Sequence, residues 1–308
     1  MHTSVLLDEF VTALCVDPDG TYVDATFGRG GHTRHLLSKL SPKARVIGLD
    51  RDPEAVSAAA ELEKEDPRFS IAHSAFSELG QVLDELGVGQ VSAIGFDLGV
   101  SSPQFDTAER GFSFQQDGPL DMRMNPESGL PLSTMLGKVS LNELTEIIRE
   151  LGGERFAGRI ARNILEAHKQ KALTTTAELE NICFHAVPKN MRHTGVHPAT
   201  RTFQALRMWV NDELGEIKAA IKASIDHLAP HGRLAVISFH SGEDRLVRDL
   251  IEDEVNPCKC PRDFPVCVCG KTPRMQWVNK KPVTPSEAEI EANPRSRSAK
   301  MRVAERLA

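Results

Sequence analysis

No run of about 18 consecutive apolar residues, the length that a membrane-spanning helix requires, occurs in this 308-residue sequence. The N-terminus also lacks a basic start, and Asp8 and Glu9 interrupt its short apolar run, which argues against a signal peptide. With 40% apolar and 26% charged residues, the composition is that of an ordinary globular protein. We therefore expect a cytoplasmic protein that has no membrane partner.

The sequence also lacks an excess of basic residues, and its net charge is −6. This deficit disfavours a protein that grips nucleic acid with its whole surface. The charge is unevenly spread, however, since residues 270–308 carry nine Lys or Arg and only four Asp or Glu. A basic tail on an acidic body suits local contact with phosphate.

The length of the chain exceeds that of a usual single domain, which favours two domains or one domain with a large insertion. Strand-like and helix-like segments alternate over the first hundred residues, and this alternation predicts a parallel sheet covered by helices on both faces. The expected strands are 22–25, 45–49, 69–72 and 91–97. After residue 197 the pattern resumes with one long amphipathic helix over 203–228 and strands over 233–238 and 300–304.

The middle of the chain has a different pattern. Residues 106–139 are rich in Gly, Pro and Asp and show no clear period, which is typical of a lid, a binding loop or disorder. Residues 140–187 are helical in pattern, with helix starts at Ser140 and Thr175 and a further helix over 154–168 between them. We therefore predict a doubly wound α/β domain over 1–105 and 198–308, interrupted by an all-helical insert over 106–197.

The segment VDATFGRGGH at 23–32 has the order strand, glycine-rich turn, helix. Such a turn lets the backbone approach a ligand closely, and the helix start presents N–H groups to it. Asp50 follows at the end of the second strand, where nucleotide-binding folds place a carboxylate against ribose hydroxyls. The dinucleotide fingerprint is incomplete, because Thr33 stands at its third glycine and Asp24 would repel a pyrophosphate. The loop therefore favours S-adenosylmethionine, whose ammonium suits a carboxylate; the structural alternative is a tight turn that Asp24 merely caps.

A second chemical signal, DLGVSSPQF at 97–105, follows the fourth expected strand, at the edge where such sheets bind ligands. Ser102-Pro103-Gln104-Phe105 resembles the Asp/Ser/Asn-Pro-Pro-aromatic motif of enzymes that methylate exocyclic amines, with Gln104 replacing the second proline. The N4 amine of cytosine is a poor nucleophile, so hydrogen-bond acceptors and alignment matter more than a strong base. Asp97, Ser102 and a loop carbonyl are the candidate acceptors, and Phe105 is a candidate to stack on a base. A proline-stiffened loop with a buried Phe105 is the structural alternative.

Nine ordered segments extend this pattern over nearly the whole chain, among them DATFGRGGHT at 24–33, DLGVSSPQFD at 97–106 and HPATRTFQALRMWVNDEL at 197–214. They resemble the bacterial ribosomal RNA small-subunit methyltransferase H family (RsmH, formerly MraW), which methylates N4 of a cytidine in the decoding centre. The resemblance implies a class I methyltransferase domain, a helical insert for substrate recognition, S-adenosylmethionine as cofactor, and small-subunit RNA or the assembled small subunit as partner. It also implies a cofactor site lined by Gly30, Gly31, His32, Asp50, Phe76, Asp97 and Gln104. Two departures, Asn125 for an expected Asp and Gly242 for an expected Leu, lie outside this set.

Several basic residues have a structural interpretation beside the functional one. Arg155, Arg159 and Arg162 share one face of an expected helix and either contact phosphates or form a solvated surface. The resemblance leads us to assign Arg159 to the substrate. We also assign His240 to the substrate, because it follows the strand at 233–238 at the ligand edge of the sheet. The basic residues between 295 and 302 either contact phosphate or form the solvent side of the last strand.

Four cysteines at 258, 260, 267 and 269 form two C-x-C pairs. Four thiolates are a possible zinc set, although zinc sites usually have C-x₂-C spacing, so the pattern leaves zinc open. We assign no metal to catalysis. The sequence also leaves open the oligomeric state, a homodimer included, and three other functions: an NAD-dependent oxidoreductase, a ribosome assembly factor without catalysis, and a DNA cytosine-N4 methyltransferase.

Overall fold

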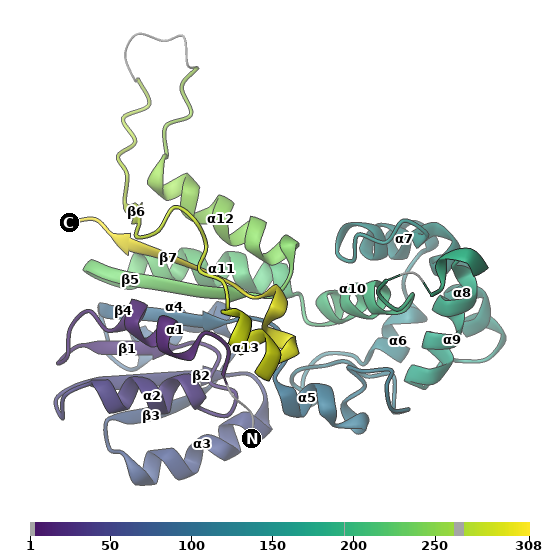
Figure 1. Cartoon of the computed structure of the whole chain (residues 1–308), viewed down its shortest axis with the longest axis horizontal. Coiled ribbons are helices and arrows are strands. Elements are labelled where there is room, and N and C mark those ends of the chain that lie inside the picture. Colours follow the sequence, from purple (N-terminus) through teal and green to yellow (C-terminus); the bar gives the residue numbers. More distant parts are fainter. Residues whose placement is uncertain (1–3, 194, 262–267) are drawn as a thin grey trace. The chain divides into compact units, whose positions relative to one another are not determined.

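The computed structural model describes residues 4–193, 195–261 and 268–308 (Figure 1). The chain divides into two compact units. The first consists of Met1–Gly99 and Leu214–Ala308, and the second of Val100–Glu213. Within the described ranges, none of the helices has the length and apolar character that crossing a bilayer would require.

A seven-stranded sheet with the order β3-β2-β1-β4-β5-β7-β6 forms the centre of the first unit. The strands are β1 (Thr21–Asp24), β2 (Arg45–Asp50), β3 (Phe69–His73), β4 (Val91–Asp97), β5 (Leu228–Ser238), β6 (Met275–Trp277) and β7 (Lys300–Arg306). Strands β1 to β5 pair in parallel, and β7 runs antiparallel to both β5 and β6. This topology confirms the predicted doubly wound α/β sheet.

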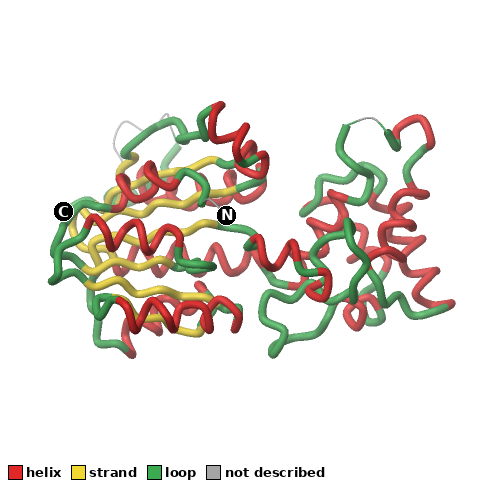
Figure 2. Tube along the Cα trace, turned by 60° about the horizontal axis from the view of Figure 1, so that its bottom comes forward, coloured by secondary structure: helices red, strands yellow, loops and turns green. Residues whose placement is uncertain are grey.

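Helices cover both faces of this sheet (Figure 2). One face packs α4 (Leu79–Glu85), α11 (Glu213–His227) and α12 (Ser241–Val255) against strand residues such as Ile94 and Phe96. The other face packs α1 (Leu7–Leu14), α2 (Gly31–Lys39) and α3 (Pro53–Glu65) against Tyr22 and Ala93, among others. The strands are nearly continuous in apolar residues because both of their faces are buried. The sequence pattern did not predict the short elements β6, α1 and α13 (Glu287–Ala292).

The prediction of one long helix over 203–228 is wrong. The chain forms α10 (Thr200–Val210) and α11, with a break at Asp212, whose φ of 46° lies in the left-handed region. Phe203 of α10 is buried in the core of the second unit, whereas Ile217 of α11 is buried in the core of the first. The boundary between the units therefore follows residue 213 instead of residue 197. Apolar spacings of three and four continue across the break, so the pattern could not show that its two halves are buried in different cores.

The second unit contains α5 (Ser102–Asp106), α6 (Leu132–Leu136), α7 (Leu141–Glu150), α8 (Ala157–Gln170), α9 (Thr176–Ala186) and α10. Its core gathers apolar residues from most of these helices, including Ile148, Ile160 and Leu179. The predicted helix caps are present, since Ser140 accepts a hydrogen bond from the Glu143 amide and Thr175 accepts one from the Glu178 amide. Helix α8 begins at Ala157 instead of residue 154, so Arg155 precedes it.

The segment 106–139, which the sequence suggested as a lid, a binding loop or disorder, packs into this second core. Leu120 and Met122 are buried there, and α6 lies within the segment. The Asn211 side chain joins the segment to α10: its Oδ1 accepts from the Met124 amide at 2.8 Å, and its Nδ2 donates to the Met122 and Arg207 carbonyls at 2.8 and 2.9 Å. One buried amide thus satisfies the backbone on both sides of Arg123, directly after Met122, whose φ is 64°.

Replacement of Asn211 by Ala leaves the Met124 N–H and the Met122 carbonyl without this partner. An unsatisfied buried polar group costs about 1–3 kcal/mol. We therefore expect Asn211→Ala to accelerate amide hydrogen exchange across residues 120–124 by about tenfold or more, measured by mass spectrometry. Asn142→Ala, at an exposed position of α7, is the matched control. Equal protection of this segment in both variants would contradict the assigned role.

Candidate functional site

Three aspartates end three neighbouring strands of the first unit. Asp24 is the last residue of β1, Asp50 of β2 and Asp97 of β4. These strands lie side by side and are parallel, so their carboxyl ends meet at one edge of the sheet. The loop 25–30, which joins β1 to α2, starts at the same edge. Doubly wound sheets bind their ligands at this edge.

The backbone of the loop requires its glycines. Gly28 and Gly30 have φ values of 56° and 73°, in the left-handed region that residues with a Cβ rarely adopt. A Cβ on Gly30 would also lie 2.6 Å from Phe27 Cζ, and a Cβ on Gly31 would lie 2.0 Å from Ser4 Oγ. The predicted ligand residues Gly30 and Gly31 therefore stand where the chain turns tightly into the first turn of α2.

The Asp50 carboxylate fastens this loop to β2. Its Oδ2 accepts the Gly28 amide hydrogen at 2.7 Å, and its Oδ1 accepts that of Asp52 at 2.9 Å. Burial raises the pKa of Asp50 to about 6, while these two amides favour its charged form. Each carboxylate oxygen has a second lone pair. Asp50 can therefore hold the loop and accept a hydroxyl hydrogen from a ligand at the same time.

The Asp24 carboxylate is held from inside the fold. Its Oδ2 accepts the hydroxyl hydrogen of Thr33 at 2.6 Å, and its Oδ1 accepts the amide hydrogen of Thr26 at 3.3 Å. Asp24 is 3% exposed and Thr33 is fully buried. Asp24 thus does cap the turn, as the structural alternative proposed. Thr33 entered the sequence argument only as a missing glycine, and its role as partner of Asp24 became visible only in the structure.

Asp97 has an unsatisfied acceptor. Its amide donates to Thr26 Oγ1 at 2.7 Å, but its buried Oδ1 has no hydrogen-bond partner in the ranges that the structure describes. Burial raises the pKa of Asp97 to about 6; the charge of His32 acts against this rise, and the carboxylates of Asp24 and Glu243 add to it. Because buried acceptors in folded proteins are nearly always paired, this oxygen indicates a donor or a cation from outside the chain.

His32 is placed beside Asp97 by the segment before α1. Its Nε2 lies 3.0 Å from the Val5 carbonyl oxygen, and its ring packs against Phe10 with centroids 4.5 Å apart. A carbonyl oxygen only accepts hydrogen bonds, so Nε2 carries a hydrogen. Nδ1 lies 3.8 Å from Asp97 Oδ2. His32 therefore lies beside the acidic edge, by which we mean the edge of the sheet that carries Asp24, Asp50 and Asp97. One of its ring nitrogens is turned towards the Asp97 carboxylate.

The electrostatics of the edge favour a cationic ligand. Asp50 and Asp97 both have a raised pKa, and neighbouring carboxylates contribute to the rise in each case. A positive group placed among them would relieve this repulsion, whereas a pyrophosphate would add to it. The arrangement thus opposes the dinucleotide alternative.

Two further predicted site residues lie in the first unit. Phe76 begins the turn after β3, is half-buried and meets the Phe96 ring edge-on at 5.8 Å. His240 follows β5 and caps α12, since its Nδ1 accepts the Glu243 amide hydrogen at 3.3 Å. Its Nε2 lies 3.1 Å from Glu243 Oε1. His240 therefore has a structural role, and its contact with substrate stays a prediction.

Ser102, Pro103, Gln104 and Phe105 all lie in α5 of the second unit. Gln104 is buried and forms a capping box with Ser101. Its side-chain oxygen accepts the Ser101 backbone amide hydrogen at 3.0 Å, and its backbone amide donates to Ser101 Oγ at 3.4 Å. The structure thus brings these residues together with one another. Their grouping with the aspartates stays a prediction.

The predicted basic residues differ in their surroundings. Arg159 and Arg162 are exposed on α8, and the side chain of neither forms an ion pair or a hydrogen bond within the described ranges. Arg302, by contrast, is 10% exposed, and its Nε and Nη2 donate to the Asp244 carboxylate at 2.6 and 3.1 Å. Lys300 approaches the same carboxylate at 3.6 Å. Arg302 therefore joins β7 to α12, and its burial shows that the interpretation as part of a solvated strand side is wrong for this residue.

Known proteins resemble this chain over its whole length. The sequence profile described as the MraW methylase family matches residues 1–307. A relative from Heliobacterium modesticaldum named "Ribosomal RNA small subunit methyltransferase H" is 48% identical over 99% of this chain and 98% of its own. Relatives of the same name from Idiomarina loihiensis and Thiobacillus denitrificans are 50% and 48% identical, over 99% and 100% of this chain and 97% of theirs.

The contact between Thr33 and Asp24 can be tested without a ligand. Thr33→Val has nearly the same shape but removes the hydroxyl that donates to a buried carboxylate, so we expect a loss of about 1–3 kcal/mol in the stability of the first unit. Thr33→Ser keeps the hydroxyl and is the control. Hydrogen exchange of β1 and α2 measures the effect, and a Thr33→Val protein protected like the Thr33→Ser protein would show that the contact contributes nothing.

Proposed function

Because this chain belongs to the MraW methylase family, we propose that it transfers a methyl group from S-adenosylmethionine to the N4 amine of a cytidine in the decoding region of small-subunit ribosomal RNA. The observation that carries the proposal is the acidic edge, where the buried Oδ1 of Asp97 has no partner among the described residues. The names of the relatives support ribosomal RNA as the substrate class. The exocyclic amine and its location follow from the motif at Ser102–Phe105 and the resemblance stated above.

The residues at the edge fit the cofactor. S-adenosylmethionine combines a sulfonium, an ammonium and a ribose diol, and when bound it supplies an electrophilic methyl group. The raised pKa values of Asp50 and Asp97 suit the approach of positive charge. The amides of Gly31 and His32, at the positive end of the α2 dipole, suit the carboxylate of a methionine group.

Each of the remaining cofactor residues has a proposed task. Asp50 accepts the ribose hydroxyls with the lone pairs that the Gly28 and Asp52 amides leave available. Phe76 offers an aromatic face after β3, next to the strand that Asp50 ends. Gln104 is kept as a cofactor residue because the resemblance implies it.

The chain must orient the amine and accept its hydrogen. The pKa of Asp97, about 6, leaves this carboxylate mostly ionised at neutral pH and therefore able to accept a hydrogen bond from the N4 amine. Ser102 and a carbonyl of the loop beside Pro103 are the other acceptors that we propose. Phe105 is half-buried, and we propose that its ring stacks on the target base.

Contact with RNA is proposed for the second unit. Arg159 and Arg162 lie one helical turn apart on α8, exposed and without an ion pair in the described ranges. Arginines in this state attract phosphate. We propose small-subunit RNA, or the assembled small subunit, as the partner in the cytoplasm, with His240 as a substrate contact at the edge of the sheet.

Purified protein, S-adenosylmethionine and small ribosomal subunits that lack the modification test the reaction directly. We expect N4-methylcytidine in the digested RNA, detected by mass spectrometry. Asp97→Ala removes the charge at the reacting edge and should lower the rate by about a hundredfold or more. Asp84→Ala, which removes an exposed carboxylate of α4, is the control.

Two outcomes of this assay would contradict separate parts of the proposal. Full turnover by Asp97→Ala would overturn the assignment of the site. Absence of N4-methylcytidine while the protein still binds S-adenosylmethionine would overturn the substrate and favour another RNA, DNA or an assembly role.

The double variant Arg159→Glu and Arg162→Glu tests the contact with RNA. Each lost phosphate contact reduces the slope of log affinity against log salt by about one, so we expect a slope smaller by about two and an RNA affinity lower by about tenfold or more. Binding of S-adenosylmethionine should be unchanged. The double variant Lys39→Glu and Lys222→Glu, at exposed positions of α2 and α11, controls for an equal change in net charge. An RNA affinity equal to that of the control would remove these arginines from the interface.

A further inference from the structure

A long connection leaves the end of α12 at Asn256 and returns to β6 at Met275 (Figure 1). Its two ends are joined by Arg274: the backbone amide donates to the Glu254 carbonyl at 2.9 Å, and Nε donates to the Glu254 carboxylate at 2.6 Å. Arg274 Nη1 also donates to Asp226 Oδ1 at 2.7 Å. The base of the connection is therefore held firmly, but no regular secondary structure holds the described residues between 257 and 274.

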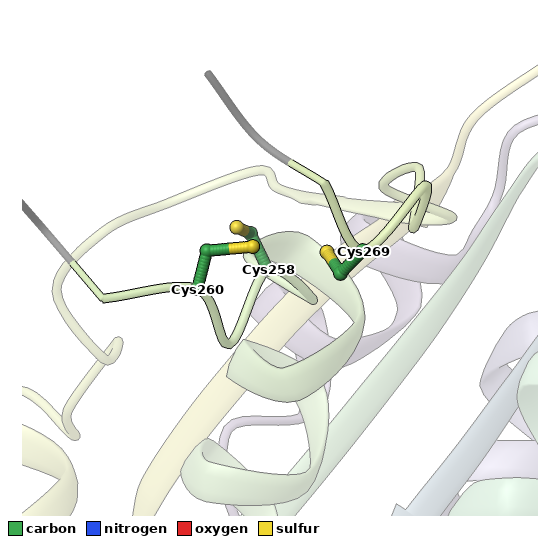
Figure 3. Close-up of side chains that lie close together, drawn as sticks. All are labelled: Cys258, Cys260 and Cys269. Carbon is green, nitrogen blue, oxygen red and sulfur yellow. The ribbon is translucent and has the colours of Figure 1, made fainter. Parts of the chain in front are cut away.

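Three cysteines meet above this base. Cys258 and Cys260 lie on the outgoing limb, and Cys269 lies on the returning limb. Their sulfur atoms all lie within 4.8 Å of one another. Figure 3 shows the three side chains gathered at one place between the limbs. The fourth cysteine of the sequence pattern, Cys267, lies outside the described residues.

We propose that Cys258, Cys260 and Cys269 bind a zinc ion that fastens the two limbs of the connection together. A zinc–thiolate bond is about 2.3 Å long, so the sulfurs around one tetrahedral ion are about 3.8 Å apart. Three sulfurs within 4.8 Å of one another reach this spacing through side-chain shifts of an ångström or less. They occupy one face of the tetrahedron, and a further ligand completes it.

The donor set narrows the choice of ion. Soft thiolates favour zinc, copper(I) and iron–sulfur clusters over the hard cations that oxygen ligands bind. In an iron–sulfur cluster each thiolate binds a different iron or shares one with a single partner, which spreads the sulfurs more widely than a single ion does. Three sulfurs that are mutually close therefore suit one ion.

Among the described residues, these three cysteines do not belong to the apolar cores. Cys258 is exposed, Cys260 is half-buried, and the neighbouring Val268 is 73% exposed. A cysteine kept for its apolar character is normally buried, as Cys183 is. A segment that cannot build an apolar core needs another source of order, and metal binding is one such source.

Local charge is compatible with a thiolate-bound ion. Zinc with three or four thiolates carries a net negative charge. Lys259 stands between the first two cysteines, and Lys271 follows Cys269 by two residues. Lys259 also pairs with Asp253 at the end of α12, which ties the outgoing limb to the helix. None of the three cysteines belongs to the proposed cofactor or substrate residues, so the ion is structural.

Metal content tests the proposal. The full-length protein is loaded with zinc, passed over a desalting column and measured by inductively coupled plasma mass spectrometry. We expect about one zinc per chain in the natural protein and in Cys15→Ser, the control, and less than about a tenth of that in the triple variant Cys258→Ser, Cys260→Ser and Cys269→Ser. X-ray absorption of the loaded natural protein should show at least three sulfur neighbours at about 2.3 Å.

Other results of these measurements would overturn the proposal. They are a natural protein that retains no zinc, a triple variant that retains as much as the natural protein, and a zinc shell of nitrogen and oxygen alone. Cobalt(II) in the natural protein provides a check that needs no variant, because thiolate ligation produces intense sulfur-to-cobalt absorption. Absence of this absorption also counts against the site.

Limited proteolysis tests the fastening of the limbs. Removal of zinc from the natural protein by a chelator should accelerate tryptic cleavage after Lys259 and Lys271 by about tenfold, and added zinc should restore protection. The triple variant should be cleaved at the fast rate whether or not zinc is added. Cleavage of the natural protein that does not respond to zinc, or a triple variant that zinc protects equally, would refute this role of the ion.

Discussion

The burial of negative charge at the carboxyl edge of the sheet is the constraint on which the site depends. Asp24, Asp50 and Asp97 end neighbouring strands, and the fold satisfies them unequally. Asp24 and Asp50 accept hydrogen bonds from Thr33 and from loop amides, and these bonds set the path of the glycine loop. Asp97 keeps a buried oxygen without a partner in the described ranges. The same arrangement thus shapes the loop and leaves a place for a positively charged ligand.

The boundary between the two units after residue 213 lies within a continuous apolar pattern, and the predicted site residues are distributed over both units. The glycine loop and the aspartates belong to the first unit, and the segment Ser102–Phe105 belongs to the second. The second unit has an apolar core of its own. Asn211 stabilises this unit by joining the segment around Met122 to α10. Most of the residues proposed for the cofactor therefore lie in the first unit, whereas Gln104 and the arginines proposed for RNA contact lie in the second.

Much of the site was predictable because its residues follow local rules. The ends of the strands at Asp50 and Asp97, the need for glycine at 28 and 30, and the helix caps at Ser140 and Thr175 depend on neighbours within a few positions. The contact of Thr33 with Asp24, the pairing of Arg302 with Asp244 and the Nε2 contact of His32 with Val5 were not predictable. Each joins side chains whose meeting depends on how helices pack on the sheet.

The sequence by itself determined the alternation of strands and helices, the acidic character of the edge and the pairs of cysteines, because periodicity and residue type are local properties. Tertiary structure decided where the stripe over 203–228 breaks, since its two halves are buried in different cores and the left-handed residue Asp212 lies between them. It also decided that Cys269 returns to within 4.8 Å of Cys258 and Cys260. The physical reason is the same in both cases: a one-dimensional pattern records which residues are to be buried or bound, but only the folded chain determines which partner each of them meets.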